Sequence, residues 1–404
     1  MQGDTLAMRS TLRNKVPEVT IFFWIIKVLC TTVGETAADF LNLNLSFGLT
    51  GTSIVMGVLL AVALVAQFRT SGYVAVVYWL AVVLISIFGT LVTDNLTDAM
   101  GFPLEFSTLL FSALLLLTFA AWYWKERTLS IHSIFTARRE AFYWLAVLFT
   151  FALGTAAGDL MAEALGLGYA TTGIIIAVAV ALLAVAWRLG LNAILAFWVI
   201  YIMTRPLGAS LGDYLTQSKV HGGLGLGASA TTGIFTGGII LTVLYLAFTK
   251  RDVTRAGAGE AAAAGRQRPL LVLAQVVAVA LLFGLASTEG YLWQSHRLQF
   301  EQQAAAATGG SNAPLGDLSS FHAMTEATLN SVNAGNWPEA NNHADEIEYA
   351  WDHAEAQLKP MNAEAWSNVD DAIDEVLRKI RAVSPDQASA RSALESLQDK
   401  IGNP

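Results

Sequence analysis

The sequence predicts an all-α polytopic membrane protein with four parallel two-helix repeats (eight membrane-spanning helices), a ninth membrane helix and a small extracytoplasmic helical bundle. Three observations lead to this fold class. The chain is unusually apolar for its length, and a motif with fixed spacing occurs four times within residues 18–248. The segment from residue 317 onward is polar and acidic, and its apolar residues recur with helical periodicity.

The composition predicts that most of the chain lies in a membrane. Of the 404 residues, 54% are hydrophobic and only 14% are charged, which is atypical of soluble globular proteins. A helix needs about 20 apolar residues to span a bilayer. Segments of this length are expected near residues 18–41, 49–67, 74–97, 104–124, 139–164, 170–188, 191–215, 228–248 and 269–288.

Several classes of function are excluded by what the sequence lacks. The single cysteine, Cys30, lies inside the first predicted helix and forms neither a disulfide framework nor a thiolate metal site. No nucleotide-binding glycine loop, nucleophile elbow, zinc-hydrolase motif or haem motif occurs. We therefore expect no enzyme activity, no cofactor and no nucleic-acid partner. Without an ATP-binding motif, uphill transport would have to use an ion gradient.

The repeated motif sets the organisation of the predicted core. Each copy has a Trp, a Gly ten residues later and an Asp five residues after the Gly. The copies are Trp24, Gly34 and Asp39; Trp79, Gly89 and Asp94; Trp144, Gly154 and Asp159; and Trp198, Gly208 and Asp213. Because each repeat has two helices, successive copies enter the membrane from the same side, so the repeats are parallel. The four Asp residues are therefore expected at one depth around a central axis.

The distribution of positive charge predicts the orientation and the domain limits. Lys and Arg gather in the N-terminal arm 1–17, in the loops that follow the even-numbered helices, and in the linker 249–268. The positive-inside rule puts these segments in the cytoplasm. The core is then expected at 18–248, the ninth helix at 269–289, a second linker at 290–316 and an extracytoplasmic bundle at 317–404.

Carboxylates within the predicted helices form the candidate site. Glu35 precedes Asp39 by four residues and so shares its helix face, while Asp98 and Glu163 follow repeated Asp residues by four. A carboxylate in the membrane costs at least about 2.5 kcal/mol and normally serves an ion path, a proton relay or an ion pair. The candidate transport or ion-binding residues are Glu35, Asp39, Asp94, Asp98, Asp159 and Asp213, and all of these except Asp98 are candidate metal ligands.

Six other residues are expected to support this site. Gly34, Gly89, Gly154 and Gly208 permit close helix approach or a break in the helix, and Gly208 is the expected break because it follows Pro206. The cations Lys27 and Arg205 each lie eight residues before an acid on the same helix and would neutralise part of the negative charge.

Structural explanations compete with these functional ones. The repeated Asp residues could cap helices or pair with headgroups, and Asp98 and Glu163 could be solvated loop acids. The four Trp residues are typical of an interfacial aromatic belt. In the tail, a solvated helix face competes with metal binding. The candidate ligands are Glu339, His343 and Glu346, with Asp345, Asp352 and His353 near by on one predicted helix, and then Asp370, Asp371 and Asp374.

The chemistry of the site favours hard cations. A site rich in carboxylates and hydroxyls, without His or Cys, suits Mg²⁺, Ca²⁺ or Mn²⁺ rather than Cu or Zn. The stretch VPEVTIFFWIIKVLCTTVGETAADFLN, echoed by YWLAVVLISIFGTLVTDNL and YWLAVLFTFALGTAAGDL, resembles a family of largely uncharacterised bacterial membrane-anchored proteins over residues 15–248. The resemblance implies a protein of the bacterial inner membrane, with its bundle in the periplasm and with export of manganese or another divalent cation as its role. The tail is similar to a small helical module attached to other bacterial membrane segments.

Three hypotheses of function follow. The first is a secondary transporter of divalent cations, with Mn²⁺ and export favoured, in which the carboxylate ring binds the cation or exchanges protons. The second is a non-transporting anchor or sensor whose periplasmic bundle binds an envelope partner while the acids pair with Lys27 and Arg205. The third is a proton-coupled carrier of an organic cation. The bilayer is a partner in each case, and a homo-oligomer is compatible with all three.

Overall fold

The computed structural model describes residues 14–44, 48–217, 219, 223–253, 274–279, 292, 314–359, 361–382 and 384–402. Every regular element in these ranges is a helix, and eight helices are long and apolar enough to cross a membrane. The all-α polytopic fold class is therefore confirmed. Most of the expected ninth helix at 269–289, most of the two linkers and residues 1–13 of the arm lie outside the described residues.

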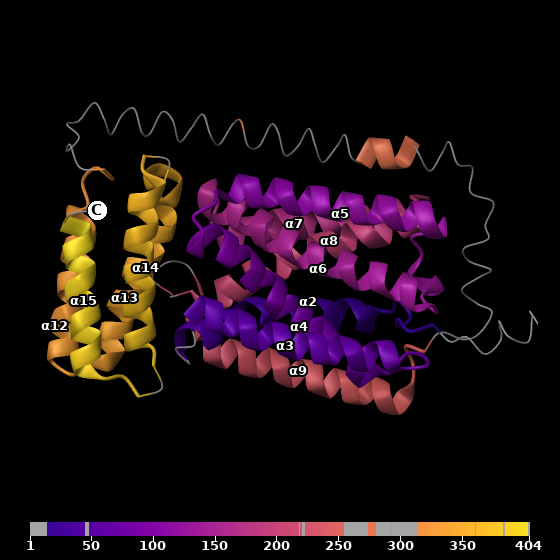
Figure 1. Ribbon diagram of the computed structural model, residues 1–404, viewed down its shortest axis with the longest axis horizontal. Coiled ribbons are helices and arrows are strands. Elements are labelled where there is room, and N and C mark those ends of the chain that lie inside the picture. Colours follow the sequence, from indigo (N-terminus) through magenta and orange to yellow (C-terminus); the bar gives the residue numbers. More distant parts are fainter. Residues whose placement is uncertain are drawn as a thin grey trace, which may run out of the picture.

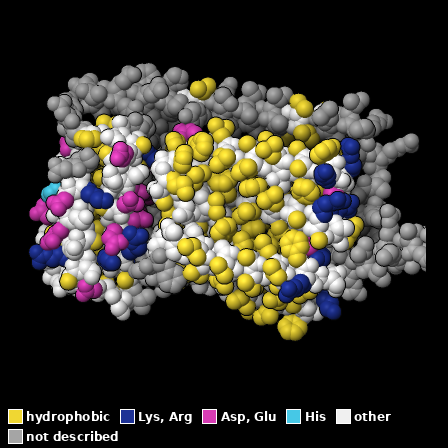
Figure 2. All heavy atoms as spheres, in the orientation of Figure 1, with side chains coloured by type: hydrophobic (Ala, Val, Ile, Leu, Met, Phe, Trp, Pro, Cys, Tyr) yellow, Lys and Arg dark blue, Asp and Glu magenta, His cyan; other side chains and the backbone are white. Residues whose placement is uncertain are grey.

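The first helix of each repeat lies inside and the second lies outside. The inner helices are α2 (Ile21–Asp39), α4 (Ala75–Asp94), α6 (Ala137–Asp159) and α8 (Ala193–Thr216). The outer helices are α3 (Gly48–Arg69), α5 (Leu104–Glu126), α7 (Tyr169–Arg188) and α9 (Gly227–Thr249). Within an apolar 18-residue stretch of each helix, 56 to 67% of the residues are buried in the inner helices and only 17 to 28% in the outer helices. The outer helices therefore supply most of the apolar belt that faces lipid (Figure 2).

The four repeats close into a ring. Inner helices α2 and α6 each contact both α4 and α8. The outer helices pack on the following repeat: α3 lies against α4, α5 against α6, α7 against α8, and α9 against α2. The last repeat thus completes the first, and the pseudo-symmetry axis runs between the inner helices.

The repeated glycines are where the inner helices approach most closely. Each meets the residue that stands three positions before the glycine of the next inner helix, and the pairs are Gly34 with Ser86, Gly89 with Phe151, Gly154 with Arg205 and Gly208 with Thr31. A Cβ atom built on these glycines would lie within 1.8 to 2.7 Å of that neighbour. The expected break at Gly208 is wrong, because α8 continues through Pro206 and Gly208 to Thr216.

The repeated Trp residues are packed inside the protein. Trp79, Trp144 and Trp198 are at most 4% exposed and belong to the core, with aromatic neighbours such as Phe23 and Tyr78. Interfacial anchoring is therefore wrong for these three, and only Trp24 is partly exposed. Their role is to fill the ring on the side opposite the repeated Asp residues.

The C-terminal bundle stands across one end of the membrane core (Figure 1). It consists of α12 (Ser319–Asn333), α13 (Trp337–Leu358), α14 (Ala363–Ile380) and α15 (Gln387–Gly402). Its core includes the stacked rings of Trp351 and Trp366, whose centroids are 3.9 Å apart. Helices α13 and α14 contact the core at the ends of the inner helices, so the bundle covers the end of the ring at which the repeated Asp residues lie.

Gly89→Ala tests the close approach of the inner helices. The added Cβ would lie 2.7 Å from Phe151 Cβ, and overpacking of this kind costs about 1 to 3 kcal/mol. Gly237→Ala on α9 is the matched control, because nothing lies within 4 Å of its Cβ position and Ala is the better helix former. We expect the SDS unfolding midpoint to fall for Gly89→Ala and to hold or rise for Gly237→Ala. Equal behaviour of the two variants would contradict the packing.

Candidate functional site

The repeated Asp residues stand where the inner helices change their geometry. Asp39, Asp94 and Asp159 are the last residues of α2, α4 and α6, and a five-residue π-helix follows each of them: η1 (Phe40–Asn44), η2 (Asn95–Ala99) and η4 (Leu160–Ala164). A π-turn is wider than an α-turn and often occurs at functional sites. It also carries a further acid in two repeats, Asp98 in η2 and Glu163 in η4.

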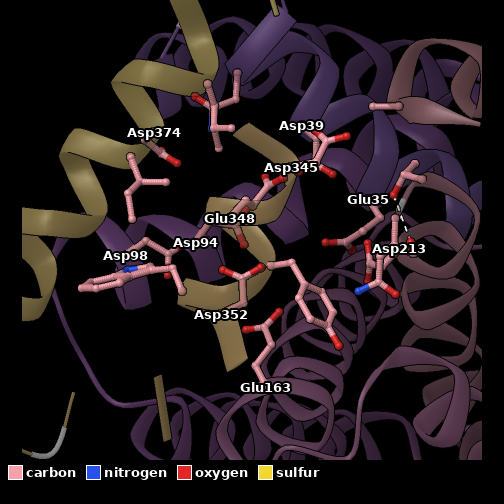
Figure 3. Close-up of a pocket in the computed structure, with 18 of the residues that line it drawn as sticks. Glu35, Asp39, Asp94, Asp98, Glu163, Asp213, Asp345, Glu348, Asp352 and Asp374 are labelled. Carbon is pink, nitrogen blue, oxygen red and sulfur yellow. Dashed lines mark hydrogen bonds between the residues drawn. The ribbon is translucent and has the colours of Figure 1, made fainter. Parts of the chain in front are cut away.

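These acids line one chamber at the mouth of the ring (Figure 3). The chamber has a volume of about 540 Å³. All six predicted ion-binding residues line it, namely Glu35, Asp39, Asp94, Asp98, Asp159 and Asp213, together with Glu163. The structure therefore brings the candidate acids together from all four repeats, and Asp98 and Glu163 are chamber residues rather than solvated loop acids. The Tyr169 hydroxyl donates a hydrogen bond to Glu163 at 2.8 Å.

The bundle supplies the opposite wall of this chamber, which the sequence reasoning missed. Six of its acids line the cavity: Asp345, Glu348, Asp352, Glu355, Asp370 and Asp374. Two cations, Lys359 and Arg381, line it as well. The sequence left the acids on α13 and α14 open between a metal site within the tail and a solvated helix face. The spacing of these acids along the two helices does not distinguish a face exposed to solvent from a face that covers another acidic surface.

A buried ion pair forms the floor of the chamber. Arg205 Nη2 lies 2.7 Å from Glu35 Oε2 and 2.6 Å from Thr155 Oγ1, and it also donates to Thr90 Oγ1. Arg205 is fully buried. The guanidinium thus joins all four inner helices, since its Nη1 also donates to the Thr31 carbonyl at 3.3 Å. The predicted neutralisation by Arg205 involves Glu35 rather than the Asp213 of its own helix.

Lys27 lies further along the axis, away from the acids. It is fully buried, and its Nζ has no hydrogen-bond partner among the described residues. The Nζ lies 3.9 Å from the ring centroid of Phe151 and 4.4 Å from that of Tyr201. Phe151 also faces Arg205, 5.9 Å from the guanidinium carbon. Lys27 therefore contacts aromatic faces and not the carboxylates that it was expected to neutralise.

The chamber holds its carboxylates apart. Within the part of the chain that the structure describes, no three His, Cys, Asp or Glu side chains are grouped closely enough to hold a metal ion directly. The same applies to the tail, where His343 Nδ1 lies 3.2 Å from Glu346 but Glu339 accepts instead from Asn336. A cation in this chamber would keep part of its hydration shell, or the acids would have to move closer together.

Burial and mutual repulsion perturb the acids on the bundle side. Burial raises the pKa of Asp374 to about 6, with Arg378 acting against the rise and Glu348 adding to it. The pKa values of Asp352 and Asp370 are raised too, first by burial and then by neighbouring carboxylates. Arg381 reduces this repulsion through contacts of 2.5 to 2.6 Å with Glu348 and Asp345. The closed chamber therefore favours bound protons or cations over bare carboxylates.

The raised pKa of Asp374 predicts a pH dependence of stability. Its folded-state pKa of about 6 exceeds the ordinary value of 3.8, so the folded protein binds more protons between these values. The stabilisation is complete below pH 4 and is lost as the pH rises through 6. A shift of this size corresponds to roughly 2 to 3 kcal/mol. We expect the thermal midpoint of Asp374→Asn to fall less than that of the wild type from pH 4 to 7. Asp399→Asn, at an exposed position on α15, should follow the wild type.

The ion pair on the chamber floor predicts strong coupling. Arg205→Met leaves Glu35 without its guanidinium, and breaking a buried pair in this way costs about 3 to 5 kcal/mol. Adding Glu35→Gln removes the unpaired charge and should restore part of the loss. SDS unfolding of both single variants and the double variant measures the coupling. Simple additivity of the two effects would contradict the pairing.

Comparisons with known proteins identify the repeat but not an activity. No curated protein and no solved structure gives a significant match to this chain. A family described as a repeat of unknown function (DUF347) matches four times, at residues 22–73, 77–128, 142–189 and 196–252. Each match takes in one inner and one outer helix of the ring. Because these matches cover more than half of the chain, the protein belongs to the DUF347 repeat family.

Proposed function

We propose that this protein is a secondary transporter of divalent cations, with Mn²⁺ as the favoured substrate and export as the favoured direction. The observation that carries the proposal is the convergence of carboxylates from all four repeats in one chamber at the end of a closed helix ring. Carboxylate oxygens are the ligands that hard divalent cations prefer. Acids kept within membrane helices are otherwise costly, which supports a role in ion binding.

The region beneath the chamber favours a carrier over an open channel. The axis below the acids is filled by the Arg205–Glu35 pair, by Phe151 and by the buried Lys27. A cation leaving the chamber in that direction would meet two positive, fully buried side chains. Passage would therefore require a rearrangement of the inner helices, as in alternating access.

The charge at the other end of the core supports the proposed orientation. Lys and Arg gather at the end of the core away from the bundle (Figure 2), and α3 and α7 end there at Arg69 and Arg188. Under the positive-inside rule this end faces the cytoplasm. The chamber and the bundle then face the periplasm of a bacterial inner membrane.

A small organic cation is the second candidate substrate. The chamber is in the size range of small-molecule sites. The aromatic residues Tyr169, Tyr349 and Trp366 also line it, and aromatic faces attract quaternary ammonium groups. The bundle's acidic surface is already used in covering the core, which makes the anchor or sensor hypothesis the weakest of the three.

Flux measurements in vesicles test the proposal. Full-length protein is reconstituted with a Mn²⁺-quenched dye inside, and Mn²⁺, Mg²⁺, Ca²⁺ or tetramethylammonium is added as substrate or competitor. We expect Mn²⁺ flux that falls at least tenfold in Asp94→Asn and in Asp159→Asn. Asp371→Asn, on the exposed side of α14, should behave as the wild type.

Three results would contradict parts of this proposal. Normal flux in both chamber variants would show that the carboxylate ring is not the transport site. Competition by tetramethylammonium alone would move the substrate to the organic class. Absence of any flux in the wild type, together with a co-purifying envelope protein, would favour the anchor hypothesis.

A further inference from the structure

One layer of the ring carries an amine that no function assigned so far uses. Lys27 stands three residues after the Trp of its repeat, and the equivalent positions in the other repeats are Val82, Val147 and Tyr201. The amine is thus unique among four corresponding positions. It is fully buried, and it is held by ring faces in place of a carboxylate or carbonyl.

A row of tyrosine side chains leads from this amine toward the end of the core opposite the chamber. The ring face of Tyr201 lies against Lys27, while Lys27 Nζ and the Tyr201 hydroxyl both lack a hydrogen-bond partner among the described residues. The hydroxyls of Tyr143 and Tyr78 are 2.5 Å apart. The ring of Tyr73 lies 5.7 Å from that of Tyr78.

The row ends on a carboxylate just beyond the membrane helices. The Tyr73 hydroxyl donates to Asp252, which is 2% exposed and follows the end of α9. Burial raises the pKa of Asp252. Hydrogen bonds among the described residues therefore join Asp252 to Tyr73 and Tyr78 to Tyr143, but none joins this row to Lys27.

The Phe151 ring lies near both the buried amine and the cation on the chamber floor. Its centroid is 3.9 Å from Lys27 Nζ and 5.9 Å from the Arg205 guanidinium carbon. Of these two cations only the amine can release its proton, because a guanidinium stays charged in proteins. Three other titratable or charged groups face Lys27, namely Cys30 on its own helix and Tyr201 and Arg205 on α8. From α6 the Phe151 ring faces the amine. Tyr78 of α4 and Tyr143 of α6 stand one layer away.

We propose that Lys27 is the proton-carrying site of this protein, that it takes up a proton on one side of the membrane and releases it on the other as the inner helices rearrange, and that its proton competes with the cation in the chamber. The proposal rests on the proposed function and adds the residue that couples it to a proton gradient. On uptake an N–H bond forms on the Lys27 amine with a proton from water on one side of the membrane, and on release the same bond breaks and the proton passes to water on the other side.

The competition follows from the distance along α2. Lys27 and Glu35 are eight residues apart, or about 12 Å of helix at 1.5 Å per residue. Two unit charges at this distance in an effective dielectric of about 20 disfavour each other by roughly tenfold in binding. A divalent ion doubles the charge and squares this factor to about a hundredfold. A bound cation therefore weakens proton binding at Lys27, and a returning proton promotes release of the cation.

Simultaneous recording of cation and proton flux tests the proposal. Full-length protein is reconstituted in vesicles that hold a pH-sensitive dye and a Mn²⁺-sensitive dye, and a Mn²⁺ gradient is applied. In the wild type we expect Mn²⁺ flux with protons moving in the opposite direction. In Lys27→Met, Mn²⁺ flux should lose its proton counterflow by at least tenfold per cation. Lys125→Met removes an exposed amine from α5 and should keep the wild-type ratio.

Two further variants keep the test decisive if Lys27→Met does not assemble. Lys27→Arg retains the charge but cannot release it, so counterflow should be lost. Tyr201→Phe keeps the ring over Lys27 and removes only a hydroxyl that does not bond to the amine, so the wild-type ratio should remain. An unchanged ratio of protons to cations in the Lys27 variants would overturn this proposal while leaving cation transport intact. Absence of Mn²⁺ flux in the wild type would overturn both.

Discussion

The close approach of the four inner helices at their glycines is the constraint on which the rest of the structure depends. Each glycine admits a side chain from the next helix, and one of these side chains is Arg205. With any larger residue at Gly154, the guanidinium would not reach Glu35, Thr90 and Thr155 together. The glycine contacts that pack the ring therefore also position the ion pair on the chamber floor. The four Asp residues converge because the inner helices that carry them approach one another at these glycines.

The ring is symmetric at its mouth and asymmetric in its interior. All four repeats supply an Asp, but only one supplies Glu35, one Lys27 and one Arg205. A strictly fourfold interior would place either four like charges or none on the axis. On the axis, the described residues place the Arg205–Glu35 ion pair and the Lys27 amine, which lacks a hydrogen-bond partner among them, so a symmetric mouth stands over an interior that differs from repeat to repeat.

The sequence was sufficient for the features that repeat. Apolar length predicted the eight helices, and the fixed spacing of Trp, Gly and Asp predicted parallel repeats with the acids at one depth. Features that depend on contacts between helices were beyond it. The π-turns after the Asp residues have no motif in the sequence, and the burial of Trp79, Trp144 and Trp198 follows from ring closure, whereas an isolated Trp near a helix end resembles an interfacial anchor. The bundle's acids could not be assigned to the chamber because spacing along a helix does not say what the helix covers.

The packing of each outer helix on the following repeat also bears on how such a chain could arise. Because α9 packs on α2, the inner helix of every repeat is covered by the outer helix of the preceding repeat. The four repeats therefore occupy equivalent places in the ring. The two ends of the ring also meet, since the Glu18 amide donates to the Asp252 carbonyl at 2.8 Å. An ancestral chain of one or two repeats would have met the same packing demand by assembling with copies of itself. Fusion into one chain would free each copy to diverge, so that a single lysine, arginine and glutamate can stand at positions that the other repeats fill differently.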